Sequence, residues 1–200
     1  TVYGVEEWLG YDGLYPARII RFQTRLGEAI WDAMEPACAI AYYVHDPAYP
    51  PLFPLDEEGR FRRAAAVDGL EIHENPHALP RARLVGGLEV VADADALYNR
   101  MRDPGFDPRR AVLADFAPPH GLPRTGDAAG AADIVQHTPS RCVVEVDAES
   151  PAVLVLADAY YPGWRARVDG ERAEIFPAYG VFRGVLVPPG THRVEFDYAP

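Results

Sequence analysis

Three aromatic side chains stand close together in the stretch DAYYPGWRARVDG, at positions 158–170. Tyr160, Tyr161 and Trp164 could form a platform for a sugar ring, because aromatic rings offer flat apolar faces with polar edges. An architectural role is the alternative: Pro162-Gly163 makes a turn and Trp164 enters the core as the first inward residue of a strand. The pattern favours architecture for Trp164 and does not decide for the tyrosines, so all three are candidate substrate-binding residues.

Asp12 is a fourth candidate, in the short motif GYDGLYP ahead of a helical stretch. Its ordinary role in that position is a helix N-cap or a turn residue. The functional alternative is contact with a polar head group carried by a membrane-embedded partner. The position favours the cap.

Acidic pairs are frequent, as in Glu6-Glu7, Glu57-Glu58 and Asp93 with Asp95. Glycoside hydrolysis needs two carboxyls about 5 to 10 Å apart across a cleft. Adjacency in the sequence does not provide that geometry, and most such acids are solvated charges or helix caps. No catalytic residue is therefore assigned, and a hydrolase using paired carboxylates stays an alternative.

The sequence predicts no metal site and no cofactor. His73 and His77 are four positions apart, but Pro76 between them argues against one helical face. Cys38 and Cys142 lack ligand spacing and are read as buried thiols, with a single long-range disulfide left open for an extracytoplasmic chain. No nucleotide-binding or nucleophile-elbow fingerprint is present.

Charge and hydropathy exclude two classes of partner. The net charge of -11 disfavours nucleic acid and anionic lipid surfaces, which need clusters of basic side chains. No apolar run approaches the roughly 20 residues that span a bilayer. We expect no nucleic-acid partner and no membrane span within these 200 residues.

The first 115 residues mix helix and strand patterns. A helical period runs through residues 15–34, where Ile19, Phe22, Leu26 and Ile30 share a face. A second helix is predicted at 93–103, with Asp93 as its N-cap. The Pro-rich residues 45–62 are predicted to be a loop. Strands are predicted at residues 37–44 (buried), 69–75, 81–87, 88–93 and within 104–115.

The period changes to two in the last third of the chain. Apolar and polar residues alternate in 141–149, 164–168 and 191–198, which predicts antiparallel strands with one wet face. Asp169-Gly170 suits a two-residue hairpin turn, and Pro189-Gly190 suits a type II turn in a second hairpin. About six short strands between 132 and 198 indicate a β-sandwich of jelly-roll or immunoglobulin-like type. We therefore expect an α+β fold with three parts: an α+β region at 1–115, a Pro/Gly/Ala-rich linker at 116–131 and the sandwich at 132–200.

The final segment, ADAYYPGWRARVDGERAEIFPAYGVFRGVLVPPGTHRVEFDYAP, resembles the extracytoplasmic C-terminal region of YfhO-like bacterial membrane proteins. These are polytopic proteins related to lipid-linked-sugar glycosyltransferases, in which a YYPGW...VDG element leads to a PPGTHRVEFDY.P segment before a last membrane helix. GYDGLYPARIIRF, ENPHALPRARLV and PGFDPRRAVL resemble earlier segments of the family, in the same order. Because the membrane helices are missing, we expect an excised soluble domain.

The resemblance implies a function. It points to a non-catalytic accessory domain on the extracytoplasmic face of the bacterial membrane, with the glycosyltransferase-like chemistry in the membrane part. The implied partners are the membrane-embedded part of the same polypeptide and a glycan or lipid-linked sugar. The expected task is recognition of an acceptor glycan or glycopolymer. A stand-alone secreted carbohydrate-binding module is the alternative from another class.

Overall fold

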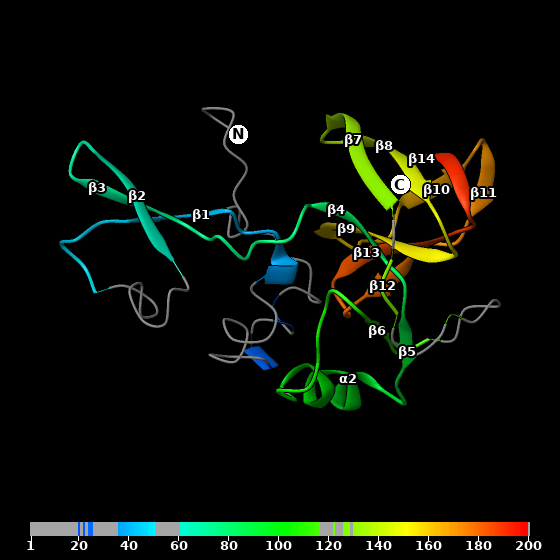
Figure 1. Ribbon diagram of the computed structural model, residues 1–200, viewed down its shortest axis with the longest axis horizontal. Helices are drawn as coiled ribbons and strands as arrows, with labels where there is room; N and C mark the ends of the chain where they lie inside the picture. The colour runs from blue at the N-terminus through cyan, green and yellow to red at the C-terminus, as the bar shows by residue number, and fades with distance from the viewer. Residues whose placement is uncertain are drawn as a thin grey trace.

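Strands dominate the protein. The computed structural model describes residues 36–50, 61–116, 126–128 and 130–199, together with positions 20, 22, 24, 25 and 122. The elements, labelled in Figure 1, are the 3-10 turn η2 (Pro36–Cys38), β1 (Tyr42–His45), β2 (Arg62–Val67), β3 (Leu70–Glu74), β4 (Ala82–Val85), β5 (Leu88–Val90), α2 (Ala94–Met101), β6 (Val112–Ala114), β7 (Gly130–Thr138), β8 (Arg141–Ala148), β9 (Ala152–Ala159), β10 (Trp164–Val168), β11 (Glu171–Ala173), β12 (Phe176–Ala178), β13 (Phe182–Val187) and β14 (Gly190–Tyr198).

Two antiparallel sheets share a hydrophobic core. One has the strand order β11-β10-β14-β8-β7 and the other β12-β13-β9-β4. Alternate residues of each strand enter the core, because successive side chains of a strand point to opposite faces. The core includes Val144, Phe196 and Ala166 from the first sheet and Leu154, Leu156 and Val185 from the second. The predicted alternation of residues 141–149, 164–168 and 191–198, and with it a β-rich antiparallel fold, is confirmed.

Strand β4, from the first half of the chain, pairs with β9 from the second half. The pairing is antiparallel, so that Ala82 lies opposite Leu156 and Val85 opposite Val153. The other face of this sheet covers a second core, to which α2, β5 and β6 contribute. The division at 115 and 132 stays a prediction, and so does the linker at 116–131, most of which lies outside the described residues.

Helix α2 follows from its sequence. Asp93 is the N-cap, and its Oδ1 accepts a hydrogen bond from the backbone N–H of Ala96 at 2.8 Å. Leu97, Tyr98 and Met101 are buried against the second core. The predicted helix and its cap are confirmed, because a short acidic side chain satisfies a backbone donor that the first helical turn leaves unpaired.

Helical structure also occurs within the predicted helix at 15–34. Ile20, Phe22, Thr24 and Arg25 are helical, and Phe22 is fully buried with its ring 6.1 Å from that of Phe182. Ile20 is 51% exposed. Ile19, Leu26 and Ile30, which were predicted to share the face of Phe22, lie outside the described residues.

A three-stranded sheet, β1-β3-β2, stands apart from the two-sheet body (Figure 1, left). The strand predicted at 37–44 is found only from Tyr42, where β1 begins, because η2 occupies the start of this stretch, and the predicted burial is wrong for Tyr42 and Val44, which are 59% and 56% exposed. Tyr42 and Val44 share one face of β1, and His45, which is buried, lies on the other. Strand β2, which starts at the end of the predicted loop 45–62, was not predicted because its residues do not alternate.

The two predicted hairpin turns differ in outcome. Asp169 and Gly170 have φ values of 52° and 86°, and they join β10 to β11 as a primed turn requires. The second hairpin is wrong: β13 lies in the four-stranded sheet and β14 in the five-stranded one, so Pro188-Pro189 carries the chain between sheets. Both strands bury an apolar face, and placing them in opposing sheets buries both faces in one core. Residues 130–198 hold eight strands rather than about six.

Candidate functional site

The predicted aromatic residues lie at one end of the shared core. Trp164 begins β10 on its inward face and packs against the core. Its ring centroid is 5.4 Å from that of Tyr198, which in turn is 6.5 Å from that of Tyr161. We call Tyr161, Trp164 and Tyr198 the aromatic cluster. Tyr198 was not singled out from the sequence, although the alternation of residues 191–198 places it on the inward face, directly opposite Trp164.

Exposure differs within this stretch. The Tyr161 side chain is 46% exposed, whereas Tyr160 and Trp164 are half-buried. Tyr160 is held through its backbone, whose N–H donates to the carbonyl of Val181 at 2.7 Å. The structure therefore brings Tyr161 and Trp164 into one cluster and places Tyr160 beside it. Asp12 lies outside the described residues.

A glycine turn positions the cluster. Gly163 has a φ of 103°, which side chains with a Cβ rarely adopt. Its carbonyl accepts a hydrogen bond from the N–H of Ala199 at 2.8 Å, and the N–H of Trp164 donates to the carbonyl of Tyr161 at 3.4 Å. The turn thus fixes Tyr161 next to the end of β14.

An arginine lies against the face of Trp164 from within the core. The Arg183 guanidinium carbon is 3.5 Å from the centroid of the Trp164 ring, and Arg183 is buried. Burial lowers the pKa of Arg183 to about 10, although the carboxylate of Asp158 opposes this shift. Cation–π contact stabilises such a desolvated charge. One face of Trp164 is therefore already occupied, as the architectural interpretation requires.

Asp158 provides the counter-charge in a buried ion network. Its Oδ1 accepts from Arg81 Nε at 2.7 Å and lies 2.6 Å from Arg81 Nη2. Its Oδ2 lies 3.6 Å from both Arg183 Nη1 and His137 Nε2. The Asp158 and Arg183 side chains are each 6% exposed, whereas Arg81 and His137 reach solvent.

This arrangement favours a scaffold over a catalytic centre. Asp158 is buried with positively charged or ring-nitrogen groups near both of its oxygens, which suits a structural counter-charge. Burial raises the pKa of the nearby Cys142 thiol to about 11, so it is protonated at neutral pH and a poor nucleophile. The accessible group is Tyr161. Sequence reasoning missed Arg81, His137 and Arg183 because they come from distant strands.

The other residues considered from the sequence have local roles. Asp93 is a cap, Asp95 pairs with Arg25 at 3.2 Å, and Glu6, Glu7, Glu57 and Glu58 lie outside the described residues. His73 is buried with Nε2 3.2 Å from Glu71 Oε2, and the N–H of His77 donates to Asn75 Oδ1. Cys38 and Cys142 are buried in different cores. Within the described ranges no three His, Cys, Asp or Glu side chains gather as metal ligands.

Comparison with known proteins found a similarity at this end of the chain. The family model described as the bacterial membrane protein YfhO matches residues 128–200. The C-terminal region of this chain is YfhO-like. The match covers strands β7 to β14, and with them the aromatic cluster, Asp158 and Arg183. No curated protein and no solved structure matches the chain. Among the residues that the structure describes, no helix has the length and apolar character to cross a membrane.

Proposed function

We propose that this chain is a non-catalytic extracytoplasmic domain of a YfhO-like polytopic membrane protein related to lipid-linked-sugar glycosyltransferases. The observation that carries the proposal is the match of residues 128–200 to the YfhO membrane-protein family. The domain contacts the membrane-embedded part of its own polypeptide and contributes to recognition of an acceptor glycan or glycopolymer.

The aromatic cluster supports glycan recognition. Tyr161 is 46% exposed and is held in place by Tyr198 and by the Gly163 turn. A tyrosine ring with a fixed orientation binds a pyranose face with little loss of side-chain entropy. Trp164 and Tyr160 contribute by positioning Tyr161, and Asp12 is retained as a candidate contact to a polar head group.

We also propose that the two sheets around the shared core form a β-sandwich of jelly-roll or immunoglobulin-like type. The support is the strand order, with β13 and β14 in different sheets and apolar side chains from both sheets in one core. Such sandwiches expose the loops at their ends, and the turn that carries Tyr161 is one of these loops.

A glycan array with the intact chain tests the binding role. Tyr161→Ala is expected to reduce binding about tenfold or more, since stacking of this kind contributes about 1–3 kcal/mol in comparable aromatic platforms. Tyr42→Ala is the matched control, because Tyr42 is an exposed tyrosine on the separate β1-β3-β2 sheet. Absence of binding, or equal losses in both variants, contradicts the glycan role.

Reporter fusions in the full-length gene product test the location. Fusions at positions 1 and 200 of this chain are expected to report the extracytoplasmic side at both junctions, between flanking membrane helices. A product without flanking helices favours the alternative, a secreted carbohydrate-binding module in which Tyr160, Tyr161 and Trp164 bind alone.

A further inference from the structure

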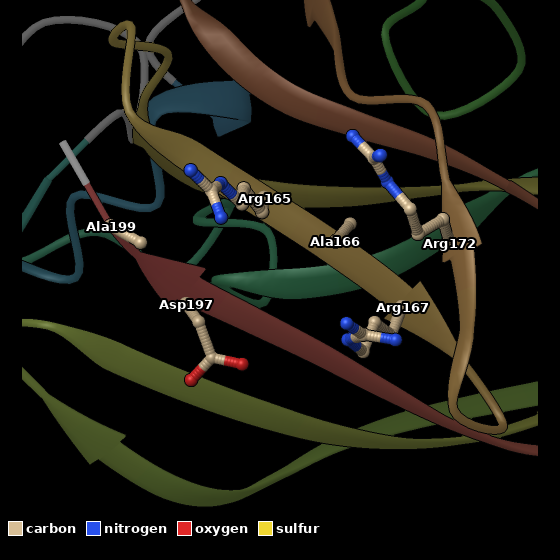
Figure 2. A pocket seen from close by; sticks show the side chains of 6 residues that line it. All are labelled: Arg165, Ala166, Arg167, Arg172, Asp197 and Ala199. Atoms are coloured by element: carbon tan, nitrogen blue, oxygen red, sulfur yellow. The ribbon is translucent and has the colours of Figure 1, made fainter.

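Three arginines line a hollow on the outward face of the five-stranded sheet. Arg165 and Arg167 stand on β10 and Arg172 on β11, and the hollow has a volume of about 420 Å³ (Figure 2). Asp197 on β14 and the small residues Ala166 and Ala199 complete its lining. We call this the arginine hollow. Its volume lies within the range of about 300–1,000 Å³ that is usual for small-ligand sites.

The backbone register places like charges side by side in this hollow. Arg167 and Arg172 are direct partners across the antiparallel β10-β11 pair. Like charges directly opposite one another destabilise a sheet. Arg165 lies two residues before Arg167 and therefore on the same face. Three positive side chains thus gather in a chain whose net charge is -11.

Within the described part of the chain, none of these three arginines forms an ion pair. Arg167 Nη1 donates to the carbonyl of Gly170 at 2.7 Å, which leaves its charge uncompensated. The side chains of Arg165 and Arg172 are exposed and project from the sheet as Figure 2 shows. The two acids that lie opposite Arg165 and Arg167 on β14 pair with other arginines instead.

The two acids on β14 that lie opposite the arginines of β10 are bound by other arginines. Asp197, which lies opposite Arg165 in the register, accepts a hydrogen bond from Arg141 Nη1 at 2.5 Å. Glu195, which lies opposite Arg167, accepts from Arg141 Nη2 at 2.6 Å and has Arg193 Nε at 3.5 Å. Arg141 is shared between the two carboxylates and offsets part of their charge, and neither carboxylate is hydrogen-bonded to Arg165, Arg167 or Arg172 in the described structure.

We propose that the arginine hollow binds a phosphate ester group of a soluble ligand. Guanidinium groups from two strands donate several N–H groups from different directions, which suits a tetrahedral phosphate better than a planar carboxylate with two oxygens. A hollow of about 420 Å³ accommodates one phosphate group, and the net charge of -11 opposes an extended anionic bilayer more strongly than a single phosphate, so we take the ligand to be discrete. This site is distinct from the aromatic cluster and does not depend on glycan recognition.

Calorimetric titration of the intact chain at low ionic strength tests the site. The probes are inorganic phosphate, glycerol 3-phosphate as a monoester and glycerophosphoglycerol as a diester, with phosphatidylglycerol vesicles as the lipid arm. Arg172→Gln and Arg165→Gln are each expected to weaken binding about tenfold, as for the loss of one charge-assisted contact. Arg193→Gln, which alters an arginine that pairs with Glu145 and Glu195, is the matched control and should change affinity less than about twofold.

A gain of affinity provides a further check. Asp197→Asn removes the one carboxylate among the described residues that line the hollow and should strengthen phosphate binding severalfold. We expect each variant to have the same midpoint of thermal unfolding as the parent, because the side chains changed are largely at the surface. An unchanged midpoint shows that the fold is unaffected. The proposal is overturned if no phosphate ester binds at concentrations about tenfold above a millimolar dissociation constant. It is also overturned if Arg193→Gln lowers the affinity as much as Arg172→Gln does, or if only the vesicles bind. Tyr161→Ala should leave phosphate affinity unchanged, so failure here is distinguishable from failure of the glycan role.

Discussion

Arginines lie on both sides of strand β10, and their surroundings differ. On the inward side Arg183 is buried, stacks on Trp164 and faces the carboxylate of Asp158. On the outward side Arg165 and Arg167 are exposed and line the hollow with no acid bound to them in the described structure. The same side-chain type thus faces a carboxylate on one side of the strand and has no bound acid among the described residues on the other.

The difference separates a structural charge from one available to a ligand. A buried guanidinium needs a counter-charge, because transfer of an isolated ion out of water costs on the order of several kcal/mol even after relaxation. An exposed guanidinium is hydrated and needs no partner. Arginines gathered at the surface without acids therefore carry a net positive potential that an anionic ligand can use. The predictions below test this contrast.

The largest effect is expected on the buried side. Asp158→Asn removes the counter-charge of Arg183 and Arg81 while keeping the volume of the side chain. It should lower the free energy of unfolding by about 3–5 kcal/mol, as for other broken buried ion pairs. Urea unfolding followed by circular dichroism measures the change. Asp197→Asn is the control on the outward side, where Asp197 is 38% exposed, and should cost less than about 1 kcal/mol.

Replacing both buried partners sharpens the test. Asp158→Leu combined with Arg183→Met should be less destabilised than Asp158→Leu alone, because the double variant buries no uncompensated guanidinium at this position. Arg81 is 32% exposed and can hydrate when Asp158 is absent. Equal losses in the single and double variants would show that the ion network contributes through packing only, and the contrast between the two sides of β10 would fail.

A second prediction concerns the ring that covers Arg183. Trp164→Ala removes the cation–π contact and exposes the guanidinium, and it should lower the free energy of unfolding by about 2–3 kcal/mol. Tyr161→Ala removes an exposed ring of the same cluster and should change it by less than about 0.5 kcal/mol. The same urea measurement compares them. A larger loss from Tyr161→Ala would contradict the assignment of Trp164 to the scaffold and Tyr161 to the surface.

The sequence predicted the parts of this site that depend on local periodicity. The alternation in residues 164–168 placed Trp164 inward and Arg165 and Arg167 outward, because the two-residue period of a strand depends only on neighbouring positions. Asp169-Gly170 predicted its turn, since that dipeptide adopts two left-handed conformations in succession. The N-cap Asp93 could also be predicted, because capping depends only on residues within one helical turn.

Long-range partners could not be predicted in this way. Arg81 meets Asp158 across 77 positions and Arg183 meets Trp164 from another sheet, so no spacing in the sequence reports these contacts. The Pro189-Gly190 turn was assigned to a hairpin because local turn signals do not say which sheet the next strand joins. Strand β2 was missed although Asp68-Gly69 marks its turn, with φ values of 51° and 85°, because alternation was absent from the flanking strand.

A third prediction uses the turn beside the arginine hollow. A Cβ at Gly170 meets no atom within 4 Å, so Gly170→Ala should cost only the strain of its φ of 86°, about 1–2 kcal/mol. Gly69 in the exposed sheet has the same dipeptide, a φ of 85° and equally open surroundings. Because β2 buries none of its side chains, Gly69→Ala should shift the global unfolding transition less. Equal shifts would show that the exposed sheet unfolds together with the body.

The smallest effect is a pH dependence at the same end of β10. His192 Nδ1 is 2.7 Å from Asp169 Oδ2, and this hydrogen bond raises the pKa of His192 above its usual value. Asp169 also accepts from the N–H of Arg193 at 2.9 Å, and that bond, with His192 second, lowers the pKa of Asp169. The histidine therefore contributes stability that is fully present below its unfolded pKa of about 6.5 and is lost as the pH rises through its folded pKa.

Asp169→Asn tests this assignment with little change to the turn, because Asn-Gly forms the same primed turn as Asp-Gly. Nuclear magnetic resonance titration of the His192 ring should show a lower pKa in the variant than in the parent, and the decline in stability above neutral pH should shrink. The Asp169 carboxylate has the opposite pH dependence. Its contribution to the stability of the fold is present above about pH 3.9 and is lost as the pH falls through its folded pKa. If the His192 pKa is unchanged in Asp169→Asn, the Asp169 carboxylate does not stabilise the protonated histidine. Asp169 would then act only as an acceptor for the backbone N–H of Arg193.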